Sequence, residues 1–144
     1  MKKCEGFTLI ELLIIVAVLA VLSSILIPEY LTSLQKAKQK ETMEDLRNVV
    51  MGLESYLVDQ NRLPLSITAL SPFYVKNLKT TDAWGHPFVY ATSGTHYSIG
   101  SPGKDGIIDL SCTTLYLPPT TMAGFNQDII FSDGKLVCGP KVSK

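Results

Sequence analysis

The residues near the N-terminus that could do chemistry are Glu11 and the Gly6-Phe7 peptide bond. Glu11 is the only charged residue between Phe7 and Ile27, and a carboxylate in an apolar run costs free energy unless it has a partner. Cleavage after Gly6 would give Phe7 a positive α-amino group one helical turn from Glu11. The carboxylate would then pair with that amine or with the amine of a neighbouring subunit. The alternative is a side chain that snorkels to the headgroups or is protonated.

The segment around Glu11 predicts a membrane-spanning helix. Phe7–Ile27 would be about 31 Å long as a helix, which is enough to cross the hydrocarbon core of a bilayer. Two lysines precede this segment, so its N-terminal end should stay in the cytoplasm and the rest of the chain should be exported. Three interpretations compete: a secretory signal cleaved after Ala20, a plain membrane anchor, and a retained helix processed after Gly6.

The string GFTLIEL, which begins at Gly6, resembles the processing site of type IV pilins and of the pseudopilins of type II secretion systems. The resemblance extends through Pro28 and covers about a quarter of the chain. It implies that a prepilin peptidase removes the leader, residues 1–6, by cutting before Phe7, and that it methylates the Phe7 amine. The retained helix would anchor the subunit in membrane lipid and later form the core of a helical filament, with Glu11 serving assembly.

Residues 7–60 are predicted to form one helix, with 7–27 as its membrane and filament-core part. Pro28 removes a backbone donor and should kink or locally open this helix. In the family, the helix loosens in this region as subunits enter the filament. The polar face beyond Pro28 is basic over 36–40 and acidic over 41–45, and it is either solvated or matched to neighbouring subunits. An apolar stripe recurs at three- and four-residue spacing and should pack on a sheet: Leu46, Val49, Val50, Leu53, Tyr56 and Leu57.

Residues 61–144 are predicted to form a globular head with a connecting loop over 61–81 and an antiparallel sheet. The strand-like runs are Pro87–Thr92, His96–Gly100, Asp128–Ser132 and Lys135–Cys138. The last two flank Asp133-Gly134, which is a strong signal for a type I′ hairpin. The expected fold class is therefore α+β, and the resemblance implies the pilin-like fold, in which a long N-terminal helix packs on a small sheet.

The string DAWGHPFVY, which begins at Asp82, is the most distinctive part of the head. By itself it predicts a turn that leads into an aromatic-rich strand. It also resembles the DPWGNPY element of the major pseudopilins of type II secretion systems. The chain departs from that pattern at Ala83, where the family has proline, and in the greater length of residues 110–127 and of the final hairpin.

A calcium site is implied by the same resemblance, because the loop after this strand binds calcium in the major pseudopilins. The matching positions are Asp105, with Asp109 and Asp128 as further carboxylates, and backbone carbonyls near Ile99. Calcium takes six to eight hard oxygen ligands, which such a set could supply. The alternative is that these are ordinary aspartates of a turn-rich loop.

Three cysteines are present, and Cys4 would leave with the leader. Cys112 and Cys138 would then be a pair in an exported head, where disulfides persist. A bridge between them is the expectation, and two buried thiols are the alternative.

Charge and motifs argue against several classes of function. The 13 Lys and Arg balance the 13 Asp and Glu, so no basic excess favours nucleic acid as a partner. The sequence has no glycine-rich phosphate loop and no Gly-x-Ser-x-Gly motif, so no enzymatic activity is expected. No cofactor is required, with calcium as the one ion that the resemblance suggests.

The resemblance implies a structural subunit of a type II secretion pseudopilus, which drives protein export. It would lie in the bacterial inner membrane with its head in the periplasm. Its partners would be copies of itself, minor pseudopilins or pilins, the prepilin peptidase and an inner-membrane assembly platform. One alternative is a type IV pilin or minor pilin for adhesion, twitching motility or DNA uptake. Another is an exported, membrane-anchored binding domain that forms no filament.

Overall fold

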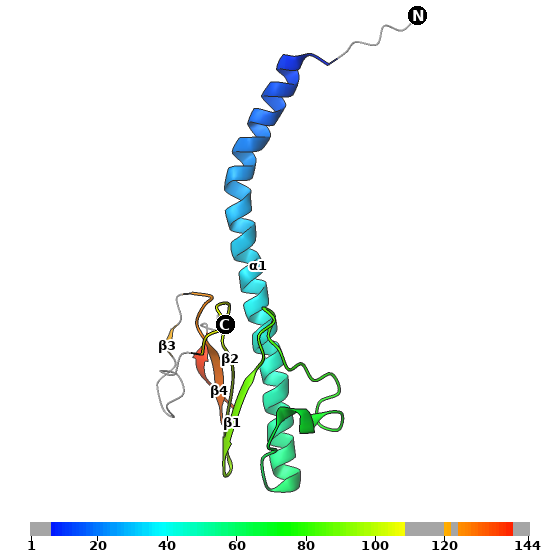
Figure 1. Ribbon diagram of the computed structural model, residues 1–144, viewed down its shortest axis with the longest axis vertical. Helices are drawn as coiled ribbons and strands as arrows, with labels where there is room; N and C mark the ends of the chain where they lie inside the picture. Colours follow the sequence, from blue (N-terminus) through cyan, green and yellow to red (C-terminus); the bar gives the residue numbers. More distant parts are fainter. Residues whose placement is uncertain (1–6, 109–119, 122–123, 140–144) are drawn as a thin grey trace, which may run out of the picture. The chain divides into compact units, whose positions relative to one another are not determined.

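The computed structural model describes residues 7–108, 120–121 and 124–139. Its longest element is helix α1, Leu9–Gln60, which runs from blue to green in Figure 1. Leucine is the most frequent residue along it and glutamate recurs, and both favour helix. α1 ends at Gln60, within the predicted stop at 59–61. Asn61 follows with a positive φ of 51°, a conformation that asparagine tolerates after a helix.

Pro28 lies inside α1, and the helix continues through it. Of the two alternatives predicted at Pro28, a kink or a local opening, the opening is absent from this structure and the kink stays a prediction. A proline in a helix interior takes its own N–H out of the helical ladder, and the rest of the ladder can continue around it. One turn later the Thr32 hydroxyl donates to the carbonyl oxygen of Pro28 at 3.0 Å. A loosening of this region during filament assembly stays a prediction.

Residues 1–35 and 36–144 form two compact units, so the second half of α1 belongs to the same unit as the strands. In the first unit α1 is exposed, and its most apolar window of 18 residues has a mean hydropathy of 2.9. By length and composition α1 is long and apolar enough to cross a membrane. This agrees with the span predicted over 7–27.

The second unit contains one sheet with the strand order β1-β2-β4-β5-β3. β1, β2, β4 and β5 are joined as antiparallel neighbours, and the sheet lies beside the later part of α1 (Figure 1). This confirms the α+β fold class. β3 pairs parallel with β5. It was not predicted, because a strand of two residues carries no alternation that a sequence pattern could reveal. The strands are β1 (Val89–Ser93), β2 (His96–Ser101), β3 (Thr120–Thr121), β4 (Ile129–Ser132) and β5 (Lys135–Gly139).

The hairpin between β4 and β5 turns at Asp133-Gly134, as the sequence predicted. Asp133 has a φ of 45° and Gly134 a φ of 76°. Positive φ at both central residues is the requirement of a type I′ turn, which matches the twist of the two strands it joins. This turn sets the register of β4 against β5 as far as Phe131 and Leu136, beyond which an irregularity shifts it so that Ile130 pairs with Cys138.

The core of the second unit lies between the apolar stripe of α1 and one face of the sheet. Leu46 and Leu53 of α1 are fully buried, and so is Ile99 of β2, whose cross-strand neighbour is Phe131. The short 3-10 helix η1, Ile67–Leu70, adds two more buried apolar side chains from the connecting loop. The stripe predicted from helical spacing thus packs on the sheet; its buried members are Leu46, Val49, Val50 and Leu53, and Tyr56 and Leu57 are partly buried.

Candidate functional site

The first turn of α1 contains the predicted assembly residue Glu11. Its Oε2 atom accepts two hydrogen bonds from Thr8, one from the backbone N–H at 2.9 Å and one from the hydroxyl at 2.6 Å. The Thr8 hydroxyl oxygen in turn accepts from the Glu11 backbone N–H at 3.4 Å. Phe7 is described and 72% exposed, whereas Gly6, on the other side of the predicted cleavage site, lies outside the described residues.

These bonds form a capping box, in which a threonine before the helix and a glutamate at its third position satisfy each other's backbone N–H groups. Sequence reasoning missed Thr8, although the Thr-x-x-Glu spacing from Thr8 to Glu11 is the signature of this motif. The structure therefore gives Glu11 a partner in its own chain. That partner is additional to the amine considered from the sequence.

A second carboxylate, Asp82, organises the head. Its side chain is fully buried. The Oδ1 atom accepts from the backbone N–H groups of Trp84 at 2.9 Å and His86 at 2.8 Å, and Oδ2 accepts from the Ser101 hydroxyl at 2.7 Å. The first two bonds close the turn that the sequence predicted for the DAWGHP string. The third joins that turn to the end of β2, which the sequence did not reveal.

The turn around Asp82 also holds the loop that follows β2. The Ser101 hydroxyl accepts from the Gly103 N–H at 3.1 Å, and the Nδ1 atom of His86 lies 2.9 Å from the Gly103 carbonyl oxygen. A side chain at Gly106, where φ is 73°, would meet the His86 ring. The imidazole of His86 is therefore packed between Asp82 and residues 103–106, and the conformation of this loop depends on Asp82.

Helix α1 is joined to this region by an ion-pair clamp. The Lys79 ammonium lies 2.9 Å from the carboxylates of both Glu41 and Asp45, and these two carboxylates hold the pKa of Lys79 above its ordinary value. The Thr42 hydroxyl, on a fully buried residue, accepts from the Ala83 N–H at 3.2 Å. Two of the acidic residues on the polar face of α1 are thus paired within the chain.

The residues predicted to bind calcium are only partly brought together. Asp105 lies in an exposed turn, where its Oδ1 accepts from the Ile107 N–H at 3.1 Å. Asp128 is buried next to β4, Ile99 is buried in β2, and Asp109 lies outside the described residues. Within 7–108, 120–121 and 124–139, no three His, Cys, Asp or Glu side chains form a group that could hold a metal ion. Because Asp109 lies outside the described residues and carbonyl oxygens also bind calcium, the site stays a prediction.

The predicted disulfide also involves a residue outside the described part of the chain. Cys138 is buried in β5, whereas Cys112 and Cys4 lie outside the described residues. The bridge between Cys112 and Cys138 therefore stays a prediction.

A third carboxylate, Asp133, connects the two hairpin turns. It accepts from the Tyr97 N–H at 3.0 Å and lies 2.9 Å from the Nδ1 atom of His96. Burial by itself raises the pKa of Asp133, but the Tyr97 N–H and His96 outweigh it and hold the pKa below the ordinary value. Burial, assisted by the negative charge of Glu54, raises the pKa of the Tyr97 hydroxyl to about 12.

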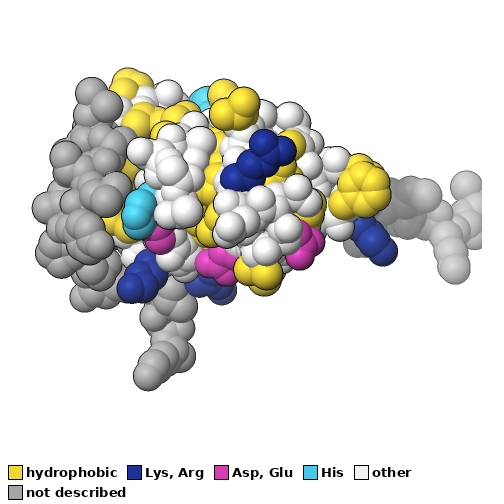
Figure 2. Space-filling model, turned by 90° about the horizontal axis from the view of Figure 1, so that it is seen from below, with side chains coloured by type: hydrophobic (Ala, Val, Ile, Leu, Met, Phe, Trp, Pro, Cys, Tyr) yellow, Lys and Arg dark blue, Asp and Glu magenta, His cyan; other side chains and the backbone are white. Residues whose placement is uncertain are grey.

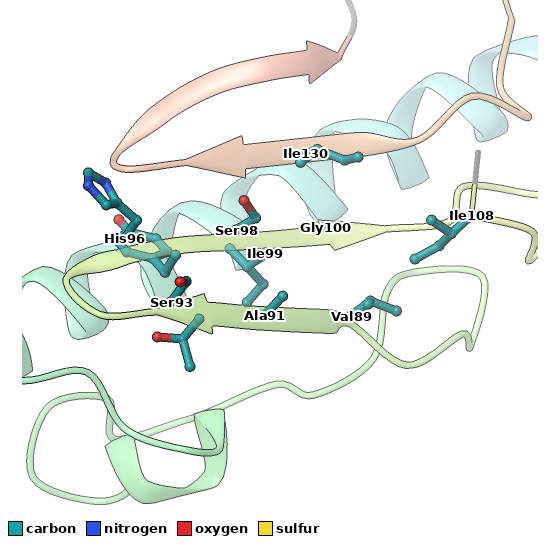
Figure 3. A pocket seen from close by; sticks show the side chains of 11 residues that line it. Val89, Ala91, Ser93, His96, Ser98, Ile99, Gly100, Ile108 and Ile130 are labelled. Atoms are coloured by element: carbon teal, nitrogen blue, oxygen red, sulfur yellow. The ribbon is translucent and has the colours of Figure 1, made fainter. Parts of the chain in front are cut away.

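A hollow of about 240 Å³ lies against β1, β2 and β4. Figure 3 shows small and apolar residues along β1 and β2, with Ile108 at one end and His96 at the other. The titratable side chains of its described lining are His96 and Tyr97. Such a lining suits an apolar contact better than acid–base chemistry.

Several large apolar side chains stay exposed at the surface of the head. Val58, Leu65 and Phe73 are 82%, 96% and 91% exposed. On the face seen in Figure 2, apolar side chains lie in separate places with charged side chains of both signs among them. This face offers several small apolar contacts and no single broad patch.

Comparison with known families gives two matches that together cover most of the chain. The family described as "Prokaryotic N-terminal methylation motif" matches residues 1–27. The family described as "Type II secretion system (T2SS), protein G" matches residues 29–111. The two matches adjoin one another at Pro28.

Individual relatives carry the same description. The "Type II secretion system core protein G" of Pectobacterium carotovorum subsp. carotovorum is 27% identical over 132 residues, which are 87% of this chain and 82% of the relative. The protein of that name from Pseudomonas aeruginosa is 28% identical over 127 residues, covering 73% and 89%. The protein from Escherichia coli (strain K12) is 26% identical over 123 residues, covering 72% and 84%. No solved structure gives a significant match.

Proposed function

Because the chain belongs to the protein G family of type II secretion systems, we propose that it is the pseudopilin of such a system and assembles with copies of itself into a filament that drives protein export. The observation that carries this proposal is the direct succession of the methylation motif, residues 1–27, and the protein G match, residues 29–111, in one chain. The family role is structural, and the chain contributes a membrane anchor and a folded head.

Processing of the N-terminus is part of this proposal. A prepilin peptidase would cut between Gly6 and Phe7 and methylate the Phe7 amine, and the match of residues 1–27 to the methylation motif supports this. Intact-mass measurement of the membrane-bound protein tests it. The expected mass is that of residues 7–144 plus one methyl group, and an intact Met1 or cleavage after Ala20 would overturn it. Gly6→Ala should slow processing without changing membrane insertion.

The location follows from the charge pattern of the anchor. With its N-terminal end in the cytoplasm, the subunit would reside in the inner membrane and hold its head in the periplasm. Minor pseudopilins, an inner-membrane assembly platform and membrane lipid would be its partners besides its own copies. Protease protection in spheroplasts tests the orientation, because only a periplasmic head is digested from outside.

Gene deletion separates the proposed function from a type IV pilus. Loss of secreted enzymes with unchanged surface motility is the expected result, restored by the wild-type gene. Loss of motility, adhesion or DNA uptake with normal secretion would overturn the assignment. Normal secretion together with normal motility would favour a membrane-anchored binding domain without a filament.

We also propose a disulfide between Cys112 and Cys138 in the periplasmic protein. The burial of Cys138 in β5 supports a structural role for this sulfur. In the chain-entropy account, closing the loop from Cys112 to Cys138 would stabilise the head by about 3–4 kcal/mol. Peptide mapping without reductant should find the two cysteines linked, and two alkylatable thiols in native material would contradict the bridge.

A further inference from the structure

We propose that Thr8 is the positioning residue for Glu11: it holds one carboxylate oxygen within its own chain and leaves the other oxygen for the N-terminal amine of a second copy. This inference rests on the proposed filament function. It begins from the three hydrogen bonds between these two residues, all of which lie within the first turn of α1.

The two carboxylate oxygens of Glu11 differ in their contacts with Thr8. Both bonds that Thr8 donates go to Oε2 of Glu11. A carboxylate has acceptor sites on both of its oxygens, and among the described residues no hydrogen bond to Oε1 is found. Thr8 therefore satisfies part of the carboxylate and leaves capacity for one more strong donor.

Apart from the Phe7 amine that processing would create, the described side chains next to Glu11 offer no further donor. The neighbouring side chains, Leu9, Ile10 and Leu12, are apolar and 59–78% exposed. In a bilayer they would face the lipid hydrocarbon, which donates no hydrogen bonds. A charged amine from another subunit is a donor that would complete the carboxylate at this depth.

The Thr8 hydroxyl also fixes the direction of the carboxylate. It donates to Oε2 and accepts from the Glu11 N–H, so the same hydroxyl holds both the carboxylate and the backbone of Glu11. A side chain already held in one conformation loses less freedom on binding than a free one. Thr8 thereby prepares Glu11 for a contact with defined axial register.

Four variants of the full chain, expressed with the assembly machinery, test this role. Thr8→Val removes the hydroxyl at nearly constant shape, and Thr8→Ser keeps it. Thr8→Asp can still cap the helix and keeps the backbone N–H, but it offers Glu11 no side-chain donor. Thr32→Val is the matched control, because it removes another α1 hydroxyl, one that bonds only to the Pro28 carbonyl. The readout is the amount of filament for each amount of processed subunit.

We expect Thr8→Val and Thr8→Asp to lower the filament yield at least about tenfold, and Thr8→Ser and Thr32→Val to stay within about twofold of wild type. Full assembly of Thr8→Asp would reduce Thr8 to a helix cap and overturn the proposal. Full assembly of Thr8→Val would overturn it as well.

A second measurement does not depend on assembly. Solid-state NMR of the full chain in lipid bilayers should find the Thr8 amide nitrogen within hydrogen-bond distance of the Glu11 carboxylate, and the carboxylate resonance should shift in Thr8→Val but not in Thr8→Ser. Absence of this contact would overturn the positioning role even if filaments form. The contact together with no filament from wild type would instead overturn the proposed function.

Discussion

Glu11 and Asp82 are carboxylates that accept the same kind of hydrogen bond in opposite surroundings. Asp82 is fully buried, and both of its oxygens are occupied by donors of its own head. Glu11 is exposed at the first turn of an apolar helix, and Thr8 occupies only one of its oxygens. The comparison indicates that a carboxylate completed within its chain serves the fold, whereas one left incomplete in an apolar setting is suited to a contact between chains.

The sharpest way to break this comparison is Glu11→Val. We expect it to abolish filament formation while membrane insertion and cleavage stay normal, because the change makes the span more apolar and does not touch the head. Sedimentation of filaments and intact mass of the membrane fraction measure the two effects. Glu29→Gln is the control, since it neutralises another exposed carboxylate of α1. Normal filaments from a pure Glu11→Val population would show that axial register comes from the head contacts.

The second largest effect should come from Asp82→Ala. It would leave two part-buried backbone N–H groups and the buried Ser101 hydroxyl without their acceptor, at a cost of about 3–5 kcal/mol in the free energy of unfolding. Urea unfolding followed by the fluorescence of Trp84, the only tryptophan, measures it. Asp105→Ala in calcium-free buffer is the matched control and should cost under about 1 kcal/mol, because Asp105 is exposed. Equal effects of the two changes would contradict the role given to Asp82.

The sequence could predict those features that depend on neighbouring residues. The end of α1, the Asp133-Gly134 turn and the antiparallel strands depend on local propensity and periodicity, so their residue types were enough. The apolar run and Glu11 were visible for the same reason. The Thr8 cap is equally local, because the Thr-x-x-Glu spacing from Thr8 to Glu11 is enough to predict it.

The remaining contacts could not be found in this way. Lys79 and Glu41 are 38 positions apart, and Ala83 and Thr42 are 41 positions apart, so no local pattern joins them. The same holds for Asp82 and Ser101, 19 positions apart. At Pro28 the residue type indicated an opening, but an exposed helix can accommodate one missing donor.

Calcium binding offers a third test of this comparison, because the ion would occupy carboxylate oxygens of the head in place of hydrogen-bond donors of the chain. We propose binding through Asp105, with Asp109 and Asp128, on the grounds that Asp105 lies in an exposed turn held by the Asp82 network. At a hundredfold excess over Kd, calcium should raise the melting temperature by about 12 °C. Calorimetry with calcium and with chelator measures this, and Asp105→Ala should remove the difference. A head indifferent to chelator would eliminate the site.

The smallest effect is expected at Asp133, whose side chain is 42% exposed and thus intermediate between the other two carboxylates. Burial raises its pKa, but the Tyr97 N–H and His96 outweigh this and hold the folded-state pKa below 3.8. The stabilisation is therefore present above about pH 4 and is lost as the pH falls through the folded pKa. Because solvent screens it, the loss should stay under about 1 kcal/mol. Urea midpoints at pH 5 and pH 3 should converge between wild type and Asp133→Asn, and a constant gap would contradict this.

The long-range clamp between α1 and residues 79–83 has a consequence for the order in which the protein folds. As the chain grows from its N-terminus, Glu41 and Thr42 of α1 reach their partners Lys79 and Ala83 only after a loop of about 40 residues has closed. Ile99 of β2 can pair with Phe131 of β4 only after Phe131 has been made, and β5 ends at Gly139. The helix is thus complete long before the head can close. We therefore expect the sheet of the head to close as one late event, after β5 has been made.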